Sequence, residues 1–582
     1  MTRTSKNIYA CVLLSLLGTS CIGILDKEPL TEMPETIVWK DPELVKAFVN
    51  SRYNGIGHGF TESWQSSVVD ETHLIWSRGC EPVTQGFISP SDLGRMNSAW
   101  NGWDNRSWAQ LWKQISNCNL FFSHIDEVPF TDEAMRKRLK GEVRFIRVLM
   151  YHDLISRWGA MPIITKAYTL NDIEEIMNAK RATYEECVNF MTAELNAIID
   201  NEELPASFSG NDQGRVTSVA ALALKSRILL YAASDLMNIE VKNECIGYLS
   251  PDPKRWEKAT EAAEECIKVA LANGYALYDK YGEDVKTKYT QLFLECGNSE
   301  VLFDREGTAS VDEENLNIID QTNGPNGYGQ WGGNTPISEF VDAFEMRDGS
   351  KFSWDNPEHK KHPYKDRDLR LAAYVLCDGD EWMGRNVEVY IDADSNGKPL
   401  SSGGRDSKYG NDNWNTSLSG YNMRKFLDET YVPNSYNTKN PKNWIWLRLG
   451  EQYLNLAESA YMTGNEPKAR EALNTIRKRA RMPEVTDSGE SLLERIRNER
   501  RIELCFEEHR YYDLRRWKLG EKYLNKAATG VTVLRLPDGG KIYQPGQLVE
   551  QRKFIERMYW LPLLKSEVDK NPNLTQNPGY TN

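Results

Sequence analysis

Two tryptophans stand three residues apart in a polar stretch of the chain, Trp100-Asn101-Gly102-Trp103. Flat aromatic side chains pair with the apolar faces of sugar rings, while asparagine and arginine side chains bind sugar hydroxyls. Because the stretch is too polar to form core, the pattern predicts an exposed platform at which Trp100, Asn101 and Trp103 bind a carbohydrate. The alternative is that both tryptophans are buried.

A second motif has the spacing of the first half of a calcium-binding loop, with Asp392, Asp394 and Asn396 at alternate positions. The bidentate glutamate expected at the twelfth position is absent, and Gly403 stands there. Alternating apolar residues before the motif and the dipeptide Asn396-Gly397 favour a β-hairpin instead. We therefore expect weak calcium binding by this segment or none.

Motifs of common enzymes are missing from the sequence, which has no HExxH, GxSxG or P-loop pattern. His359 and His362 lie three residues apart, but an isolated HxxH among lysine and proline is weak evidence for a metal site. None of the 84 acidic residues is singled out by its context as a catalytic carboxylate. We expect that the protein is not an enzyme and needs no metal or other cofactor.

A dense run of charged residues spans 497–516. At helical spacing its members form the pairs Arg500 with Glu503 and Arg510 with Asp513, and Glu503 also meets Glu507. The pattern is better explained by an ion-pair network that fixes the last helices than by a catalytic site.

The elements that position these residues belong to an acidic chain of 582 residues, long enough for one large or two to three ordinary domains. Its formal net charge is −13 at pH 7. So acidic a chain gains nothing from counterion release, which makes nucleic acid a poor partner. The 17 tryptophans and 27 tyrosines exceed what a core needs and leave some for a ligand-stacking surface.

The beginning of the chain has the pattern of a secretory signal. Arg3 and Lys6 precede a mostly apolar run over 8–17 that is far too short to span a bilayer. Small residues then lead to Cys21, as at a lipoprotein processing site. We expect a signal peptide over 1–20, a lipid on Cys21 and a tether over 21–40; an ordinary signal with an incidental Cys21 is the alternative.

Helical periodicity dominates two parts of the chain. It predicts helices within 108–157, over 218–237 and 256–273, and, after residue 440, over 449–460 and 469–480. Small residues on both faces of the paired helices favour stacked hairpins of the tetratricopeptide type. Cys118, Cys187 and Cys266 lie in these helices among apolar neighbours, which favours buried free thiols.

The character of the chain changes over 305–440, where glycine, asparagine, aspartate and aromatic residues crowd together. Outside a helical stretch at 336–346 the periodicity nearly vanishes, so the pattern predicts a long loop-rich insertion with a few short strands. Loops of this length inside a compact domain are usually functional.

Several short segments follow one another along the mature chain in a characteristic order. They are Trp108-Ala-Gln-Leu-Trp112, Gly141-Glu-Val-Arg-Phe-Ile-Arg147, Arg157-Trp-Gly-Ala-Met-Pro162, Gly214-Arg-Val-Thr217, Asn298-Ser-Glu-Val-Leu-Phe303, Glu499-Arg-Arg-Ile-Glu-Leu-Cys-Phe-Glu507 and Gln576-Asn-Pro-Gly579. Together, in this order and spacing, they resemble the SusD/RagB family of outer-membrane nutrient-capture lipoproteins. The resemblance covers essentially the whole mature chain.

The resemblance implies a mainly α fold with helical hairpins, a SusD-like N-terminal region over 41–240 and a SusD/RagB C-terminal region over 298–582. It implies a lipid anchor on the exterior of the outer membrane and a SusC-like TonB-dependent transporter as partner. The family's binding loops correspond to Trp76 and Arg78, to Trp100–Trp103, and to Tyr328 and Trp331 in a glycine-rich segment, whose aromatic residues we expect to be exposed.

We therefore predict a surface lipoprotein that captures an oligosaccharide or polysaccharide. The first alternative is a RagB-like protein that captures peptides. The second is a surface glycoside hydrolase, which needs a pair of carboxylates flanking an aromatic cleft. The third is a pure protein-interaction scaffold.

Overall fold

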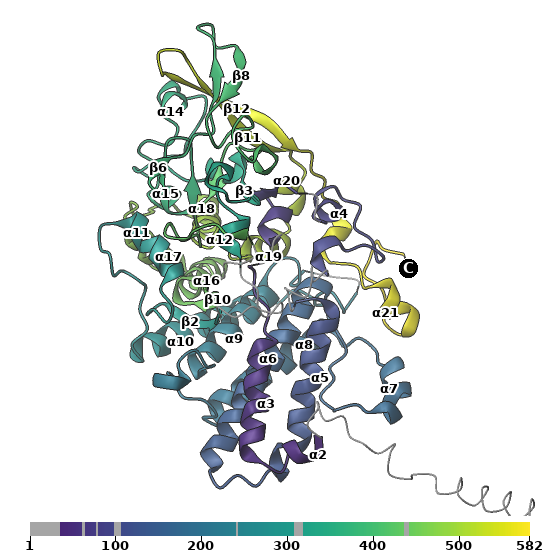
Figure 1. Ribbon diagram of the computed structural model, residues 1–582. Helices are drawn as coiled ribbons and strands as arrows, with labels where there is room; N and C mark the ends of the chain where they lie inside the picture. Colours follow the sequence, from purple (N-terminus) through teal and green to yellow (C-terminus); the bar gives the residue numbers. More distant parts are fainter. Residues whose placement is uncertain are drawn as a thin grey trace, which may run out of the picture.

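Helices make up the lower part of the molecule and loops with short strands make up the upper part (Figure 1). The structure, a computed structural model, describes residues 35–60, 64–76, 79–97, 106–239, 243–307, 318–435 and 441–581. In these ranges no helix combines the length and the apolar character that crossing a bilayer requires.

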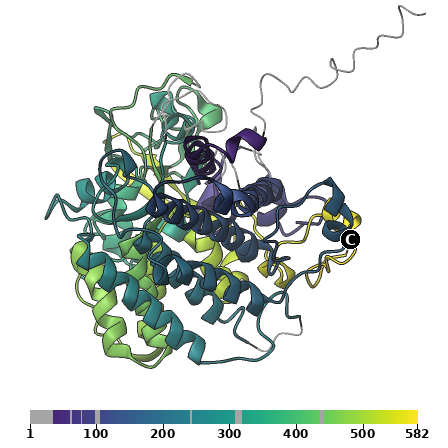
Figure 2. The same ribbon diagram turned by 90° about the horizontal axis from the view of Figure 1, so that it is seen from below.

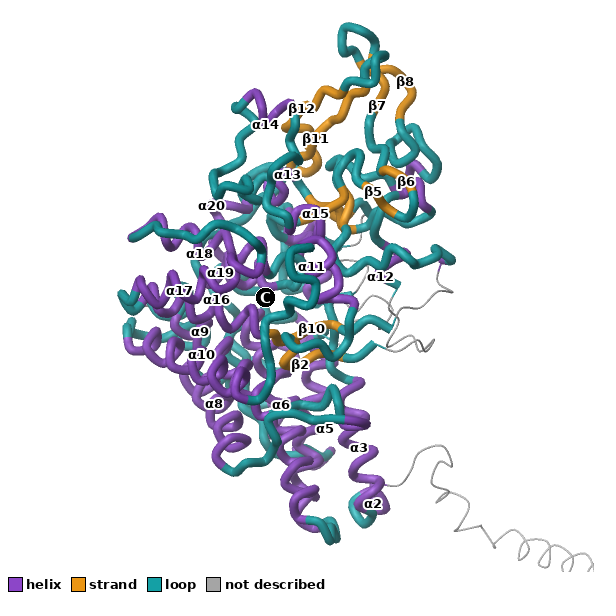
Figure 3. The backbone as a smooth tube through the Cα atoms, turned by 90° about the vertical axis from the view of Figure 1, so that its left-hand side faces the viewer, coloured by secondary structure: helices purple, strands orange, loops and turns teal. Residues whose placement is uncertain are grey.

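The long helices stack as antiparallel neighbours into one array. They are α3 (Pro42–Asn54), α5 (Trp108–His124), α6 (Glu133–Trp158), α8 (Tyr184–Asp200), α9 (Ser218–Ala233), α10 (Lys254–Ala272), α16 (Leu449–Met462), α17 (Glu466–Arg479) and α18 (Gly489–Glu503). The first half of the chain meets the second where α10 packs against α16, and the array continues through α17 (Figures 2 and 3). The predicted mainly helical fold is confirmed.

Local sequence signals explain where these helices begin and end. At the start of α8, Thr183 and Glu186 form a capping box, in which each side chain accepts a hydrogen bond from the other's backbone N–H. Gly464 takes a left-handed backbone with φ of +78° between α16 and α17, and Pro467 lies in the first turn of α17. Such stop and start signals made these helices predictable.

The loop-rich part is held together by small sheets. The largest has the order β12-β11-β7-β8 and contains β7 (Ile391–Ala393), β8 (Pro399–Gly403), β11 (Ala528–Arg535) and β12 (Lys541–Glu550). Two-stranded sheets join β1 (Thr72–Leu74) to β3 (Asn334–Pro336), β2 (Val301–Arg305) to β10 (Trp444–Arg448), β4 (Val375–Leu376) to β9 (Asn422–Met423), and β5 (Glu381–Trp382) to β6 (Arg385–Asn386). The expected short strands are therefore present.

Short helices connect these parts. They are α2 (Glu35–Val38), α4 (Glu81–Thr84), α7 (Ile173–Met177), α11 (Val285–Leu294), α12 (Ile319–Thr322), α13 (Ser338–Val341), α14 (Pro357–Lys361), α15 (Arg370–Tyr374), α19 (His509–Arg516), α20 (Gly520–Leu524) and α21 (Lys565–Lys570). The helix predicted over 336–346 was wrong in length, since only α13 forms there. Long-range contacts prevail beyond it: Glu345 pairs with Arg477 at 3.0 Å and Met346 forms a β-bridge with Arg367.

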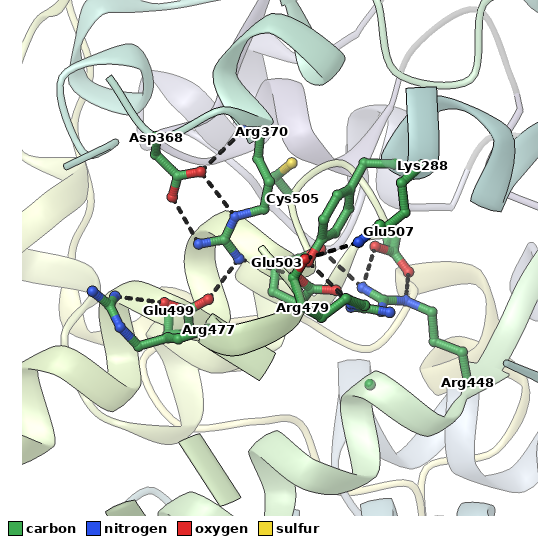
Figure 4. A network of polar contacts seen from close by, with 12 residues as sticks. Lys288, Asp368, Arg370, Arg448, Arg477, Arg479, Glu499, Glu503, Cys505 and Glu507 are labelled. Carbon is green, nitrogen blue, oxygen red and sulfur yellow. Dashed lines mark hydrogen bonds and ion pairs between the residues drawn. The ribbon is translucent and has the colours of Figure 1, made fainter. Parts of the chain in front are cut away.

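A buried ion-pair network joins α18 to the strands and helices around it (Figure 4). Glu503, fully buried at the end of α18, accepts hydrogen bonds from Arg448 at 2.8 Å, from Arg370 at 3.0 Å and from Arg479. Glu507 binds Arg448 at 2.7 Å. The cluster connects β10, α15, α17 and α18 at the centre of the molecule.

The predicted partners within this charged run were wrong. Arg500 pairs with Asp513 at 2.8 Å rather than with Glu503, and Arg510 pairs with Asp70 at 2.8 Å. Each predicted pair lies within one helix, α18 or α19, but the fold supplies other partners: Glu503 is bound by Arg370, Arg448 and Arg479, and Asp70 lies at Arg510. The network itself is present, but it is buried and long-range.

The eight cysteines of the described ranges are all free thiols, and six of them are buried. Cys118, Cys187 and Cys266 lie on buried faces of α5, α8 and α10, as predicted. Burial raises the pKa of the Cys118 thiol to about 12, so this thiol is held in its neutral form.

A buried histidine makes stability depend on pH. Burial, reinforced by the charge of Arg227, lowers the pKa of His152 to about 3, whereas an unfolded histidine titrates near 6.5. Between these values the unfolded chain binds a proton that the folded chain does not, so stability falls as pH falls below 6.5. From pH 7 to 4.5 the wild type should lose about 2.5 kcal/mol more stability than His152→Gln. Urea unfolding of both proteins at the two pH values measures this difference, and equal losses would contradict it.

Candidate functional site

Two predicted site residues from distant parts of the chain meet above the helical array. The rings of Trp76 and Trp331 are edge to face, with centroids 6.4 Å apart. The register of β1 with β3 causes this, since Leu74 pairs with Asn334 and the Ile75 N–H donates to the Gly333 carbonyl at 3.1 Å. The antiparallel ladder thus carries Trp76 to the side of Trp331.

The glycine-rich segment has a different role from the predicted one. A Cβ on Gly332 would lie 2.2 Å from the Asn415 carbonyl oxygen, and a Cβ on Gly333 would lie 2.4 Å from that of Thr322. These glycines let three backbone segments approach closely. The expectation that the aromatic residues here are freely exposed was wrong, because dense packing leaves Tyr328 and Trp331 half-buried.

Tyr328 is held by a charged neighbour. Its hydroxyl donates to the Arg385 carbonyl at 2.9 Å, and the Arg385 guanidinium lies 3.5 Å from the ring centroid. Arg385 also forms two hydrogen bonds to Asp406, at 2.8 and 2.9 Å. Because the guanidinium covers a ring face, Tyr328 supports the site more than it offers a stacking surface.

A fourth aromatic residue, Trp414, escaped the sequence reasoning. Its side chain is 68% exposed, and it lies in the 3-10 turn Asn413–Asn415. The next residue, Asn415, accepts a hydrogen bond from the Trp76 indole N–H at 3.2 Å. A signal was available, since Trp414 stands among asparagines and an aspartate just as Trp100 and Trp103 stand in a polar stretch.

We call Trp76, Tyr328, Trp331 and Trp414 the aromatic patch. It offers one exposed indole, with the exposed amides of Asn411 and Asn413 close to it in the sequence, and two half-buried indoles in edge-to-face contact. Such a surface can stack on an apolar ring face and bind hydroxyls around it. The buried carboxylate of Asp406, which binds Arg385 next to Tyr328, also accepts a hydrogen bond from the Glu388 N–H.

The other predicted site residues lie outside the described residues. These are Arg78, Trp100, Asn101 and Trp103, together with the predicted lipidation site Cys21. Their roles stay predictions.

The half calcium loop forms a hairpin, as predicted. Strands β7 and β8 pair antiparallel around it, but five residues, 394–398, connect them rather than two, with Gly397 left-handed at φ of +79°. Asp394 accepts hydrogen bonds from the N–H groups of Asn396 and Lys398, both at 2.9 Å. Asp392 pairs with Arg535 at 2.7 Å. Both carboxylates therefore have partners within the hairpin and its sheet, and weak calcium binding or none stays a prediction.

Comparison with protein families gives two matches that together cover most of the chain. Residues 299–580 match the family described as "SusD family". Residues 25–230 match a family described as "Starch-binding associating with outer membrane".

Individual relatives agree with these matches. A SusD-like protein, P25, of Formosa agariphila is 22% identical and aligns over 88% of this chain and 90% of its own length. The crystal structure of a SusD-like protein from Bacteroides fragilis is 29% identical, with a TM-score of 0.75 over 95% of this chain and all of that one. A SusD-like carbohydrate-binding protein from the same species, 20% identical, has a TM-score of 0.71 and covers 92% of this chain and all of its own.

Proposed function

The chain belongs to the SusD family, and we propose that it captures an oligosaccharide or polysaccharide at the cell surface and delivers it to a SusC-like TonB-dependent transporter. The observation that carries the proposal is the exposed Trp414, whose neighbour in the chain, Asn415, accepts a hydrogen bond from Trp76 of the Trp76–Trp331 pair. Members of this family are carbohydrate-binding proteins, and one family description associates them with the outer membrane. The aromatic patch supplies the stacking surface that such a ligand needs.

A glycan fits the aromatic patch better than a peptide does. Charged groups that would bind a peptide's termini or charged side chains are already paired here, since Asp406 and Arg385 neutralise each other beneath Tyr328. What the patch offers is aromatic surface and neutral amides, which match a polyhydroxylated chain. This contrast favours glycan capture over the RagB-like alternative.

Titration calorimetry tests the ligand class. The mature protein is titrated with maltoheptaose, laminarihexaose, xylohexaose and mannohexaose, and separately with mixed tripeptides to hexapeptides. We expect heat from at least one glycan and none from the peptides. Heat from peptides alone would replace glycan capture by peptide capture. Reducing ends released during long incubation with the glycans would indicate a hydrolase instead.

An exposed apolar stripe supports the proposed protein partner. Leu170, Ile173, Ile176 and Met177 lie at helical spacing on α7 and the turn before it, and Leu170 is 87% exposed. Asn571 holds the end of this segment by donating to the Ala179 carbonyl at 2.8 Å. A fixed, exposed apolar stripe is typical of an interface.

Leu170→Asp should lower co-purification of the transporter from membranes at least about tenfold, because it places a charge where a leucine would be buried. The matched control is Leu271→Asp, a substitution of a leucine that is 49% exposed on α10. Equal losses in the two variants, or none in either, would show that the stripe is not part of that interface.

The anchor is a separate proposal that rests on the sequence around Cys21. Cells fed a tagged fatty acid should label the wild-type protein, and Cys21→Ala should lose the label entirely because the acylated thiol is gone. Gel fluorescence after immunoprecipitation measures it, with Cys11→Ala as the matched control. Undiminished labelling of Cys21→Ala would remove the anchor assignment.

A further inference from the structure

A second concave site lies away from the aromatic patch. It is a groove of about 590 Å³ bounded by the 207–217 loop, the end of α10 and strand β2, the strand that pairs with β10 in Figure 3. This volume lies within the range of small-molecule sites. Its lining is polar and includes Gln213, Tyr275, Asp304, Glu306 and Asn443.

Asp304 is the unusual member of this groove. Its side chain is only 6% exposed, and the Asn443 amide donates to one of its oxygens at 2.8 Å. In the described part of the chain, every other buried carboxylate except that of Glu71 forms an ion pair with arginine or lysine. Asp304 has no such pair, and it is one of the residues that line the groove. The Asn443 hydrogen bond therefore leaves acceptor capacity on a buried carboxylate at this site.

Neighbouring side chains fix the shape of the groove. The Gly307 N–H donates to Asn443 Oδ1 at 3.1 Å, which orients the amide that holds Asp304. A Cβ on Gly214 would lie 2.2 Å from Glu306 Oε1, so that carboxylate packs directly over the glycine backbone. Asp304 lies in β2 and Glu306 directly follows the strand, and both residues line the groove.

The chemistry of the lining selects a donor-rich ligand. Carboxylates only accept hydrogen bonds, whereas the amides of Gln213 and Asn443 both donate and accept. Burial, reinforced by the charge of Glu306 and opposed by the Asn443 hydrogen bond, raises the pKa of Asp304 to about 6. Hydroxyl groups of a ligand that donate hydrogen bonds to the charged carboxylate would replace the water contacts that burial removes. Tyr275 adds a half-buried ring at the same groove.

We propose that this groove is a second carbohydrate-binding site, which takes a neutral sugar unit through hydroxyls donated to Asp304 and Glu306. It shares the ligand class of the proposed function but not its residues, so either can fail without the other. Two sites on one chain would let a polysaccharide bind at more than one point along its length.

The test uses saturation-transfer NMR with a mixture of glucose, galactose, mannose and xylose, on a protein whose patch is disabled by Trp331→Ala and Trp414→Ala. We expect at least one sugar to receive saturation. Glu306→Gln removes a charge-assisted hydrogen bond to the sugar, and Asn443→Ala removes the amide that orients Asp304. Adding either substitution should weaken the contact with the sugar about tenfold or more. Glu484→Gln, a substitution of an exposed acid outside the groove, is the matched control and should change nothing.

Two outcomes would overturn the second site. The first is that none of the four sugars receives saturation. The second is that Glu306→Gln and Asn443→Ala keep the wild-type unfolding midpoint and the sugars still receive the same saturation. Sugar contact in the groove without oligosaccharide binding at the aromatic patch would overturn the proposed site and leave this one standing.

Discussion

Glu503→Ala should lower the free energy of unfolding by about 3–5 kcal/mol. The substitution removes a fully buried carboxylate to which Arg370, Arg448 and Arg479 all donate. Three buried guanidinium groups would then share fewer anions. An uncompensated buried charge is far more costly than a missing surface pair. Urea unfolding followed by tryptophan fluorescence measures the change.

The matched control for this experiment is Glu494→Ala. Glu494 lies on the same helix but pairs with Lys351 at 3.8 Å on the surface, where both side chains are exposed. Exposed pairs contribute about 0–1 kcal/mol, so the control should unfold almost like the wild type. Similar losses in both variants would mean that burial of the network adds no stability.

The charged run around Glu503 shows what sequence reasoning reaches and where it stops. Charges at 497–516 correctly predict a structural ion-pair network, but spacing along the chain cannot show that Arg510 pairs with Asp70, 440 residues away. Only the fold brings α19 to the start of β1. The same limit explains why the helix predicted at 336–346 ends after α13, where long-range contacts of Glu345 and Met346 prevail.

Long helices were predictable because their signals are local. The stretch ending at Asn273-Gly274 and the break at Gly464 before Pro467 both depend on backbone preferences within one turn of the helix. The loop-rich insertion carries no such periodicity, so composition predicted its character but not the order of its sheet, in which β7 lies beside β11 from the end of the chain.

The candidate site was predictable only in part. Resemblance pointed to Trp76 and Trp331, but their contact depends on the pairing of β1 with β3 across about 260 residues of chain. Trp414 carried the same local signal as Trp100 and Trp103, an indole among polar residues. Glycines beside Trp331 suggested exposure, whereas the structure uses them for close backbone contact.

Trp414→Ala should weaken glycan binding by about 30-fold or more and leave the free energy of unfolding nearly unchanged. A central aromatic contact commonly contributes ~2 kcal/mol or more to binding. A protein that captures a ligand in order to deliver it needs only modest affinity. A dissociation constant of about 0.1–1 mM corresponds to a binding free energy of roughly −4 to −5.5 kcal/mol. Losing one such contact therefore puts binding beyond easy detection. Stability should hold because the Trp414 side chain is 68% exposed.

Comparing Trp414→Ala with Trp331→Ala separates ligand contact from packing. Trp331 packs on Ile318 and meets Trp76, so its removal should weaken binding and also lower stability by ~1–3 kcal/mol, less than the ~3–5 kcal/mol of a fully buried indole. Phe87→Ala, which truncates an aromatic residue 50% exposed elsewhere, is the matched control for both. Calorimetry with the glycan that binds the wild type measures affinity, and urea unfolding measures stability. If Trp414→Ala binds like the control, the ligand contacts lie elsewhere, and Trp100→Ala and Trp103→Ala become the deciding variants because their polar stretch carries the same chemistry.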